Sequence, residues 1–312
     1  MPNLHPQIQK VLEAMANFDL RPFEEMTPAQ ARAQMEAMAG SRKAEALPVA
    51  AVENRTIPGP AGRIAVRIYT PNGQGHRPAI VYFHGGGHVI GSLDSHDLVA
   101  RNLCGGVEAV VVSVDYRMGP EHRFPAAVED ATAALDWVHA SAASLGADPE
   151  RLGVHGDSAG ANLAAVVAII ARDSGGPRLC LQSLVYPVAD FRMGSESYKE
   201  YATGCGILTA GAMRWFRGHY LRTMDDAQDW RASPLLAPDL KGVAPAIVIA
   251  AECDVLHDEG LAYAERLKAA GVAVEYRRYA GMIHAFFGMM PAVDDAMNAQ
   301  RAVWAAFKQA FA

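Results

Sequence analysis

The segment Gly156–Gly160 reads Gly-Asp-Ser-Ala-Gly and holds the first candidate for chemistry, the hydroxyl of Ser158. An apolar stretch typical of a strand precedes it at 151–155, and a small-residue stretch typical of a helix begins at Ala159. Glycines on both sides of the serine suit a very tight strand-to-helix turn, because side chains there would collide. Such a turn exposes the hydroxyl at the positive end of the helix, so the pattern predicts a nucleophilic serine.

A run of glycines, His84–Gly87, directly follows the short apolar strand predicted at 79–83. Consecutive glycines weaken regular structure, so their value lies in exposed backbone N–H groups. Acyl transfer needs such donors where negative charge develops on the carbonyl oxygen, and loss of one donor slows it about a hundred- to a thousand-fold. The competing interpretation, a phosphate-binding loop, fails because neither phosphate-loop signature is present. We expect His84 to support the loop rather than act as a base.

A serine nucleophile needs a base, and we expect His284 to supply it from among the 11 histidines. This residue comes just after the strand predicted at 274–279, and Gly281 before it suits a mobile imidazole. The acid expected to orient the imidazole is Asp254, which lies just past the strand predicted at 246–251. The resulting chain order of serine, acid and histidine is the one expected when the serine sits on a strand-to-helix turn.

Other acids near this position stay open as alternatives: Glu252, Asp258 and Glu259. The last two fall in the first turn of the next predicted helix, where the helix dipole by itself explains acidic residues. Whichever acid serves, it would fix the tautomer of the imidazole and stabilise its charged form without taking its proton. Asp157 is too close to Ser158 in the chain for this role, and we expect it to brace the loops.

The elements that must position these residues alternate along the chain. Apolar runs predict strands at 63–69, 79–83, 109–114, 151–155, 181–185 and 246–251. Most of these runs are continuous rather than alternating, which indicates strands buried on both faces of a parallel sheet. Helical spacing of apolar residues falls between them, at 125–141, 159–171 and 261–270. The alternation predicts an α/β fold with a doubly wound, mostly parallel sheet.

Two amphipathic or Ala-rich helices, predicted at 4–15 and 28–40, precede the first strand, and Thr27 before Pro28 resembles a helix start. We therefore divide the chain into N-terminal helices at 1–50 and a catalytic domain at 51–312. An aromatic-rich helical insertion at about 190–230 follows the carboxyl end of a strand, where ligands bind in such sheets. The N-terminal helices and the insertion are expected to form a cap over the site.

The composition excludes several classes of protein. The chain has 312 residues, 51% of them hydrophobic, which is enough for a large core. A formal net charge of −6 argues against nucleic acid or a polybasic membrane contact as a partner. The longest apolar run, 163–171, is far shorter than the roughly 20 residues needed to span a bilayer.

Four scattered cysteines form no C-x-x-C pair, so neither a zinc site nor a disulfide framework is expected. The first residues lack a basic stretch followed by an apolar one, and we expect no secretory signal. We therefore expect a cytoplasmic protein that acts on a small molecule, binds neither nucleic acid nor membrane, and needs no metal or cofactor.

Together the motifs resemble the hormone-sensitive-lipase family of the α/β-hydrolases, the bacterial family IV of carboxylesterases. The resemblance covers nearly the whole chain, and its motifs occur in the family's order: His84–Gly87, Asp115–Ala127, Gly156–Gly160, Asp254–Glu259 and Ile283–His284. It implies an α/β-hydrolase fold with a helical cap and a catalytic triad of Ser158, Asp254 and His284. It also implies an oxyanion hole made by the N–H groups of Gly86, Gly87 and Ala159, with His84, Gly85 and Asp157 as supporting residues. One departure is His88, because family members often have an aromatic residue there.

The resemblance implies a serine carboxylesterase that forms an acyl-enzyme on Ser158 and needs no cofactor. We expect short- to medium-chain esters as substrates, and the family suggests a homodimer. An amidase or a lactonase on the same triad is the first alternative, because the triad itself does not set specificity. A non-catalytic small-molecule receptor is the second, and the presence of His284 counts against it.

Overall fold

The structure, a computed structural model, describes residues 3–18, 20–40, 44–203 and 205–312. In this part of the chain, eight strands form one sheet in the order β1-β2-β4-β3-β5-β6-β7-β8. The strands are β1 Ala51–Gly59, β2 Gly62–Thr70, β3 Arg77–Phe83, β4 Val110–Asp115, β5 Ala147–Asp157, β6 Leu179–Val185, β7 Ala246–Cys253 and β8 Val274–Ile283. Strand β2 runs antiparallel to its neighbours β1 and β4, and every other pairing is parallel. The prediction of a doubly wound, mostly parallel sheet is confirmed.

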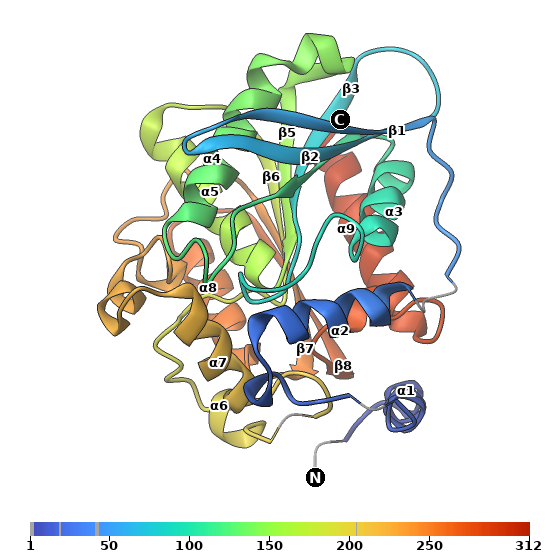
Figure 1. Cartoon of the computed structure of the whole chain (residues 1–312). Helices are drawn as coiled ribbons and strands as arrows, with labels where there is room; N and C mark the ends of the chain where they lie inside the picture. The colour runs from blue at the N-terminus through green and yellow to red at the C-terminus, as the bar shows by residue number, and fades with distance from the viewer. Residues whose placement is uncertain (1–2, 19, 41–43, 204) are drawn as a thin grey trace.

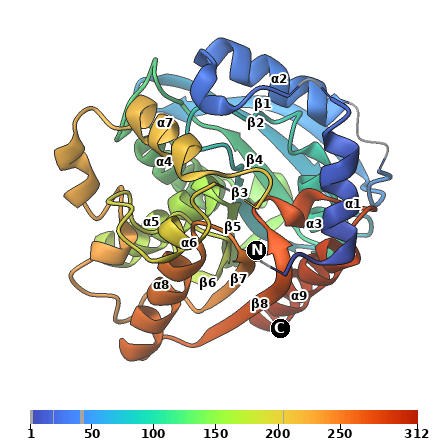
Figure 2. The ribbon, with the colours of Figure 1, turned by 90° about the horizontal axis from the view of Figure 1, so that it is seen from below.

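Helices cover both faces of the sheet (Figure 1 and Figure 2). The helices are α1 Pro6–Met15, α2 Pro28–Gly40, α3 Asp97–Val107, α4 Ala126–Ala140, α5 Ala159–Ser174, α6 Ser197–Glu200, α7 Ala210–Tyr220, α8 His257–Ala269 and α9 Asp294–Phe311. Helices α3 and α9 share one hydrophobic cluster with the sheet, and α4, α5 and α8 share the other. The sheet is therefore the middle layer of three, as the alternation of strands and helices requires.

The central strands show why their sequences are continuously apolar. In β3, Ile80 and Tyr82 point into the cluster of α3 and α9, whereas Val81 and Phe83 point into the cluster of α4, α5 and α8. All four side chains are fully buried. Successive residues of a strand face opposite sides, so a strand covered on both faces needs an apolar residue at every position.

Two elements escape prediction from the sequence. Strand β1 lies at an edge of the sheet, and among its side chains only Ile57 is buried, so its sequence carries little apolar pattern. Helix α3 contains Gly105 and Gly106, which lower helix propensity. A Cβ at Gly106 would lie 2.2 Å from the ring of Trp304 on α9, so close packing of the two helices explains that glycine.

The N-terminal helices and the insertion lie below the carboxyl ends of the strands (Figure 1), and the segment between α1 and α2 contacts α7. The ring of Phe23 lies 5.1 Å from that of Phe216 on α7, and Trp215 Nε1 donates a hydrogen bond to the Met26 carbonyl at 3.1 Å. Helix α2 begins as predicted, with Thr27 Oγ1 accepting from the N–H of Gln30. None of the helices that the structure describes has the length and apolarity to cross a bilayer.

Candidate active site

Ser158 occupies the turn between β5 and α5, with φ 56° and ψ −119°. The backbone there is packed too tightly for side chains on the flanking glycines. A Cβ at Gly156 would lie 2.2 Å from the backbone of Gly160, and one at Gly160 would lie 1.9 Å from the carbonyl oxygen of Phe83. The N–H of Ser158 donates to the carbonyl of Val185 on the adjacent strand at 2.8 Å, which fixes the turn. The strained serine is thus held by its surroundings.

The structure brings Ser158, His284 and Asp254 together in one hydrogen-bonded chain. Nε2 of His284 lies 2.9 Å from Oγ of Ser158, and Nδ1 of His284 lies 2.7 Å from Oδ2 of Asp254. The relative exposures are 8% for the serine, 8% for the histidine and 2% for the aspartate, so solvent reaches the first two and barely touches the third. A hydroxyl, an imidazole and a carboxylate in this order can generate a serine nucleophile.

The carboxyl ends of two neighbouring strands supply the imidazole and the acid. Asp254 follows β7, and the N–H of Leu256 donates to its Oδ1 at 3.0 Å, which leaves Oδ2 for the imidazole. His284 follows β8, and its ring centroid lies 4.5 Å from that of Tyr186. The aspartate and the imidazole are therefore each held from a second side.

The alternative acids have other partners. Glu252 accepts from the N–H of Gly281 at 2.7 Å, Asp258 from the N–H of Ser197 at 2.8 Å, and Glu259 from the N–H of Ala189 at 2.8 Å. Burial raises the pKa of Glu259 well above its usual range, although the backbone N–H donors oppose this shift. Among these four acids, only Asp254 forms a hydrogen bond with the imidazole of His284.

The glycine run forms a loop beside Ser158. Gly86 has φ 119° and Gly87 has φ 60°, conformations that L side chains rarely adopt. A Cβ at Gly86 would lie 2.1 Å from the Ile90 carbonyl oxygen, and one at Gly87 would lie 2.2 Å from the ring of Phe216. Within the described chain, neither N–H group of Gly86 and Gly87 donates to another protein group. These donors are thus free to bind a ligand.

Asp157 connects this loop to the serine turn. Its Oδ1 accepts from the hydroxyl of Tyr82 at 2.8 Å and from the N–H of Gly85 at 3.2 Å, and Oδ2 lies 3.7 Å from Nε2 of His96. Burial by itself would raise the pKa of Asp157, but His96 and the hydrogen bonds lower it to about 2. His96 was not singled out from the sequence, because an isolated histidine in a loop has no motif to mark it.

His84 packs inside the protein under the glycine loop. Its ring stacks on Tyr116 at a centroid distance of 4.6 Å, and Nδ1 lies 2.8 Å from the carbonyl oxygen of Gly85. Burial, followed by repulsion from His96, lowers the pKa of His84 to about 4. His155, on β5, is also fully buried, and its Nδ1 bonds Oγ of Ser183 inside the sheet at 2.9 Å. Both imidazoles are fully buried and bond to groups other than Ser158, whereas His284 bonds to Ser158.

Comparisons with known proteins identify the family of the chain. A family model described as the alpha/beta hydrolase fold matches residues 80–288. Carboxylic ester hydrolase LipN of Mycobacterium tuberculosis is 47% identical over 244 residues, which are 76% of this chain and 65% of LipN. Carboxylesterase NlhH of the same organism is 43% identical over 272 residues, which are 85% of each chain. The chain belongs to the hormone-sensitive-lipase-like family of α/β-hydrolases.

A solved structure supports the membership over the full length of this α/β-hydrolase. The hyperthermophilic esterase of the archaeon Pyrobaculum calidifontis is 42% identical, with a TM-score of 0.92 over 99% of each chain. The alignment with LipN covers slightly less than two thirds of that relative, whereas the alignments with NlhH and with the archaeal esterase cover far more.

The α/β-hydrolase has a cavity of about 340 Å³ that reaches Ser158 and His284. Its wall includes Gly86, Gly87 and His96, while residues 15–38 and 206–216 contribute mainly apolar side chains: Met15, Phe23, Met35, Met38, Leu208, Met213 and Phe216. Flexible methionines of this kind adapt to ligands of different shape. The cavity is therefore mainly apolar, and the hydroxyl and the imidazole are among its polar groups.

His88, where the family resemblance implies an aromatic residue, is fully buried and lies outside this cavity. Its ring stacks on Tyr220 at a centroid distance of 3.9 Å with an interplanar angle of 15°. Burial, with repulsion from His84, lowers the pKa of His88 to about 3, so the imidazole is neutral. The side chain therefore packs behind the loop as a flat ring and does not line the cavity.

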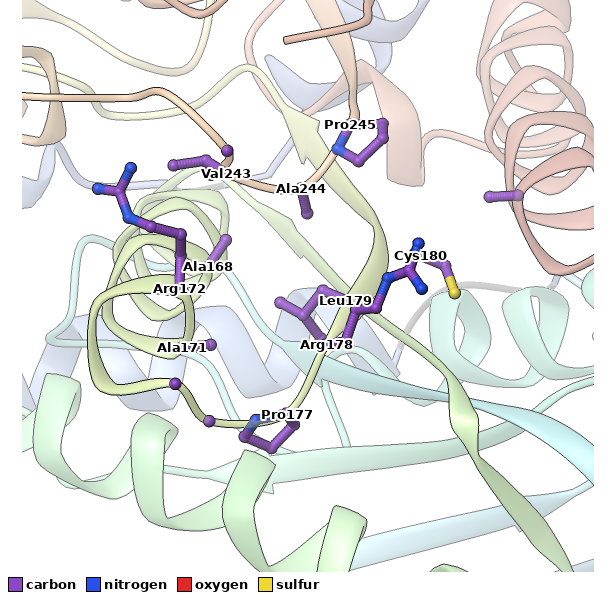
Figure 3. A pocket seen from close by; sticks show the side chains of 14 residues that line it. Ala168, Ala171, Arg172, Pro177, Arg178, Leu179, Cys180, Val243, Ala244 and Pro245 are labelled. Atoms are coloured by element: carbon purple, nitrogen blue, oxygen red, sulfur yellow. The ribbon is translucent and has the colours of Figure 1, made fainter.

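Another hollow, of about 480 Å³, lies at the opposite end of the sheet, where α5 ends and β6 begins (Figure 3). Arg172 and Arg178 lie on its wall, and Arg172 Nη2 donates to the carbonyl of Asp239 at 2.9 Å. The amino ends of parallel strands rarely carry the active site of such a sheet. This hollow contains none of the residues predicted for catalysis.

Proposed function

We propose that the protein is a serine carboxylesterase that hydrolyses short- to medium-chain esters through an acyl-enzyme on Ser158. Its family and its relatives make it a carboxylic ester hydrolase. The observation that carries the proposal further is the chain of contacts from the serine to His284 at 2.9 Å and from there to Asp254 at 2.7 Å.

In the proposed reaction, Oγ of Ser158 attacks the ester carbonyl while Nε2 of His284 takes its proton. The tetrahedral intermediate then breaks its bond to the leaving oxygen as His284 passes that proton to this oxygen, so the alcohol departs and the acyl group stays on the serine. A water molecule, activated by the same imidazole, then releases the acid and restores the hydroxyl. Asp254 accepts a hydrogen bond from the Nδ1–H group of His284 and stabilises the imidazolium each time it forms.

The negative charge on the carbonyl oxygen is proposed to bind the N–H groups of Gly86, Gly87 and Ala159. Among the residues that the structure describes, the first two donate to no protein group, and Ala159 opens α5, where helix geometry leaves the N–H unused. Donors fixed in advance by the loop and the helix stabilise the transition state without reorganisation. No metal or cofactor enters any step, which stays a prediction.

The cavity supports the proposed substrate size. Its volume of about 340 Å³ lies near the lower end of the range of about 300–1,000 Å³ found for small-molecule sites. The wall is made mainly of apolar side chains, so it favours an acyl or alkyl chain over a charged group. A series of esters from acetate to palmitate tests this point, with the highest kcat/KM expected below about ten carbons; emulsified long-chain triglycerides as the best substrates would refute it.

The decisive experiment is labelling with an organophosphonate followed by mass spectrometry. One adduct on Ser158 is expected, together with a loss of several orders of magnitude in kcat for Ser158→Ala at an unchanged melting temperature. Near wild-type activity in that variant would refute the assignment. Matched ester and amide substrates compare esterase with amidase activity, and we expect the ester to react faster.

Three further points belong to the proposal. The N-terminal segment at 1–50 and the insertion near 190–230 act as a cap on a catalytic domain at 51–312, supported by their side chains in the cavity wall. The chain forms a homodimer, supported by the position of β8 at an edge of the sheet that the structure describes, and testable by light scattering. A cytoplasmic location is supported by the four free cysteines and is testable by cell fractionation.

A further inference from the structure

Arg32, on α2, contacts the part of the chain that carries Gly86 and Gly87, although it lies in the N-terminal segment. Its Nε donates to the carbonyl of Val89 at 2.8 Å, and its Nη2 donates to the carbonyl of Gly119 at 2.7 Å. The two loops that it joins both belong to the catalytic domain. One guanidinium from outside that domain therefore ties them together.

The loop after β3 needs such support because regular structure does not hold it. Gly86, Gly87 and His88 all have positive φ, at 119°, 60° and 60°. Inside the loop, the N–H groups of Val89 and Ile90 both donate to the Gly86 carbonyl, at 3.0 and 2.9 Å. This turn directs the carbonyl of Gly86 toward Ile90, so its geometry also decides where the adjacent N–H groups point.

Gly119 also contacts the loop directly through its own N–H group. The N–H of Gly119 donates to the His88 carbonyl at 2.8 Å, while the carbonyl of Gly119 accepts from Arg32. Arg32 in turn binds the carbonyl of Val89, the next residue after His88. Two consecutive carbonyls of the loop are thus held from outside, one by Arg32 directly and the other by a peptide that Arg32 also holds.

We infer that Arg32 is a positioning residue for the oxyanion-binding N–H groups of Gly86 and Gly87, so that the N-terminal helix takes part in catalysis. The inference rests on the proposed function. The planar guanidinium has donors pointing in fixed directions and can reach both carbonyls at once, which a lysine ammonium on a flexible stem cannot reproduce. Misplacement of catalytic donors by about 1 Å is enough to slow a reaction about a hundred-fold.

The ion pair of Arg32 with Glu121 is a separate contact. Nη1 and Nη2 bind the two carboxylate oxygens at 2.9 and 2.6 Å. The hydrogen bond from Arg32 lowers the pKa of Glu121 to about 2, so this carboxylate is charged at neutral pH. The Glu121 side chain is 54% exposed, and exposed pairs contribute little to geometry or stability. We therefore assign the positioning to the two carbonyl contacts, and Glu121→Gln serves as the matched control.

The test compares Arg32→Ala, Arg32→Lys and Glu121→Gln in the full chain on an ester and on the thionoester that has sulfur in place of the carbonyl oxygen. Sulfur accepts hydrogen bonds weakly, so the rate ratio of ester to thionoester measures the oxyanion hole. For Arg32→Ala we expect kcat on the ester to fall about ten- to a hundred-fold with KM within about three-fold of wild type. The rate ratio is expected to fall about ten-fold, with Arg32→Lys in between and Glu121→Gln like wild type.

A purely structural role predicts a different result, because a lower active fraction slows both substrates equally and leaves the ratio unchanged. An unchanged ratio in both folded Arg32 variants overturns the inference, as does an equal loss in Glu121→Gln. If Arg32→Ala does not fold, Arg32→Lys with the wild-type ratio overturns it as well. Phosphonate labelling of wild type separates the two proposals: without an adduct on Ser158 the proposed function fails, whereas a normal adduct with unaffected Arg32 variants defeats only this inference.

Discussion

Replacing Asp254 by asparagine changes one atom of the proposed triad and leaves its shape intact. In the wild type, the N–H of Leu256 donates to Oδ1 at 3.0 Å and Oδ2 faces Nδ1 of His284 at 2.7 Å. An asparagine places its carbonyl oxygen against the N–H of Leu256, since two donors would repel there. Its NH₂ group then faces the imidazole.

This orientation inverts the tautomer of His284. Nδ1 must accept from the NH₂ group, so the ring proton moves to Nε2, which lies 2.9 Å from Oγ of Ser158. A protonated Nε2 cannot take the serine proton, and the carboxylate that stabilises the imidazolium is also gone. The corresponding change in another serine hydrolase lowers kcat about ten-thousand-fold, or about 5 kcal/mol of transition-state stabilisation, and we expect a similar loss here.

The assay is kcat for a short-chain nitrophenyl ester, with the melting temperature as the check on folding. Glu252→Gln is the matched control, because its amide oxygen can still accept from the N–H of Gly281 and the residue does not touch the imidazole. We expect the control to retain activity within about three-fold, since its hydrogen bond survives. A folded Asp254→Asn variant with more than a tenth of wild-type kcat would refute the proposed role of Asp254.

Two further predictions concern Gly87 in the glycine loop and Asp157, which contacts this loop. Gly87→Ala is expected to reduce kcat at least about a hundred-fold, because its Cβ would lie 2.2 Å from the ring of Phe216 at a positive φ; kinetics with near wild-type kcat would contradict this. The pKa of Asp157 falls from 3.8 to about 2 on folding, so the stability it contributes, about 2 kcal/mol, is present above pH 3.8 and lost as the pH falls toward 2. Urea titrations should therefore show a shallower loss of stability in this range for Asp157→Asn, and identical slopes would count against the assignment.

The parallel core could be predicted from the sequence because burial on both faces leaves continuous apolar runs. The exact ends of the strands and helices were harder to predict from the sequence. Strand β5 begins at Ala147 rather than near residue 151, because the polar residues at 148 and 150 carry no apolar pattern. The sequence did not predict helix α3, because Gly106 lowers helix propensity and is required only by close packing against α9.

The sequence by itself determined the nucleophile turn, the glycine loop and the order in which serine, acid and histidine follow, since each depends on local backbone geometry or on strand ends. The tertiary structure decided which acid meets His284, because four acids lie within eight residues and only the fold sets their distances. The contacts concerned join residues 30 and 126 positions apart. It also decided what else holds the loop: His96 and Arg32 carry no motif, and their contacts arise only when distant segments pack together.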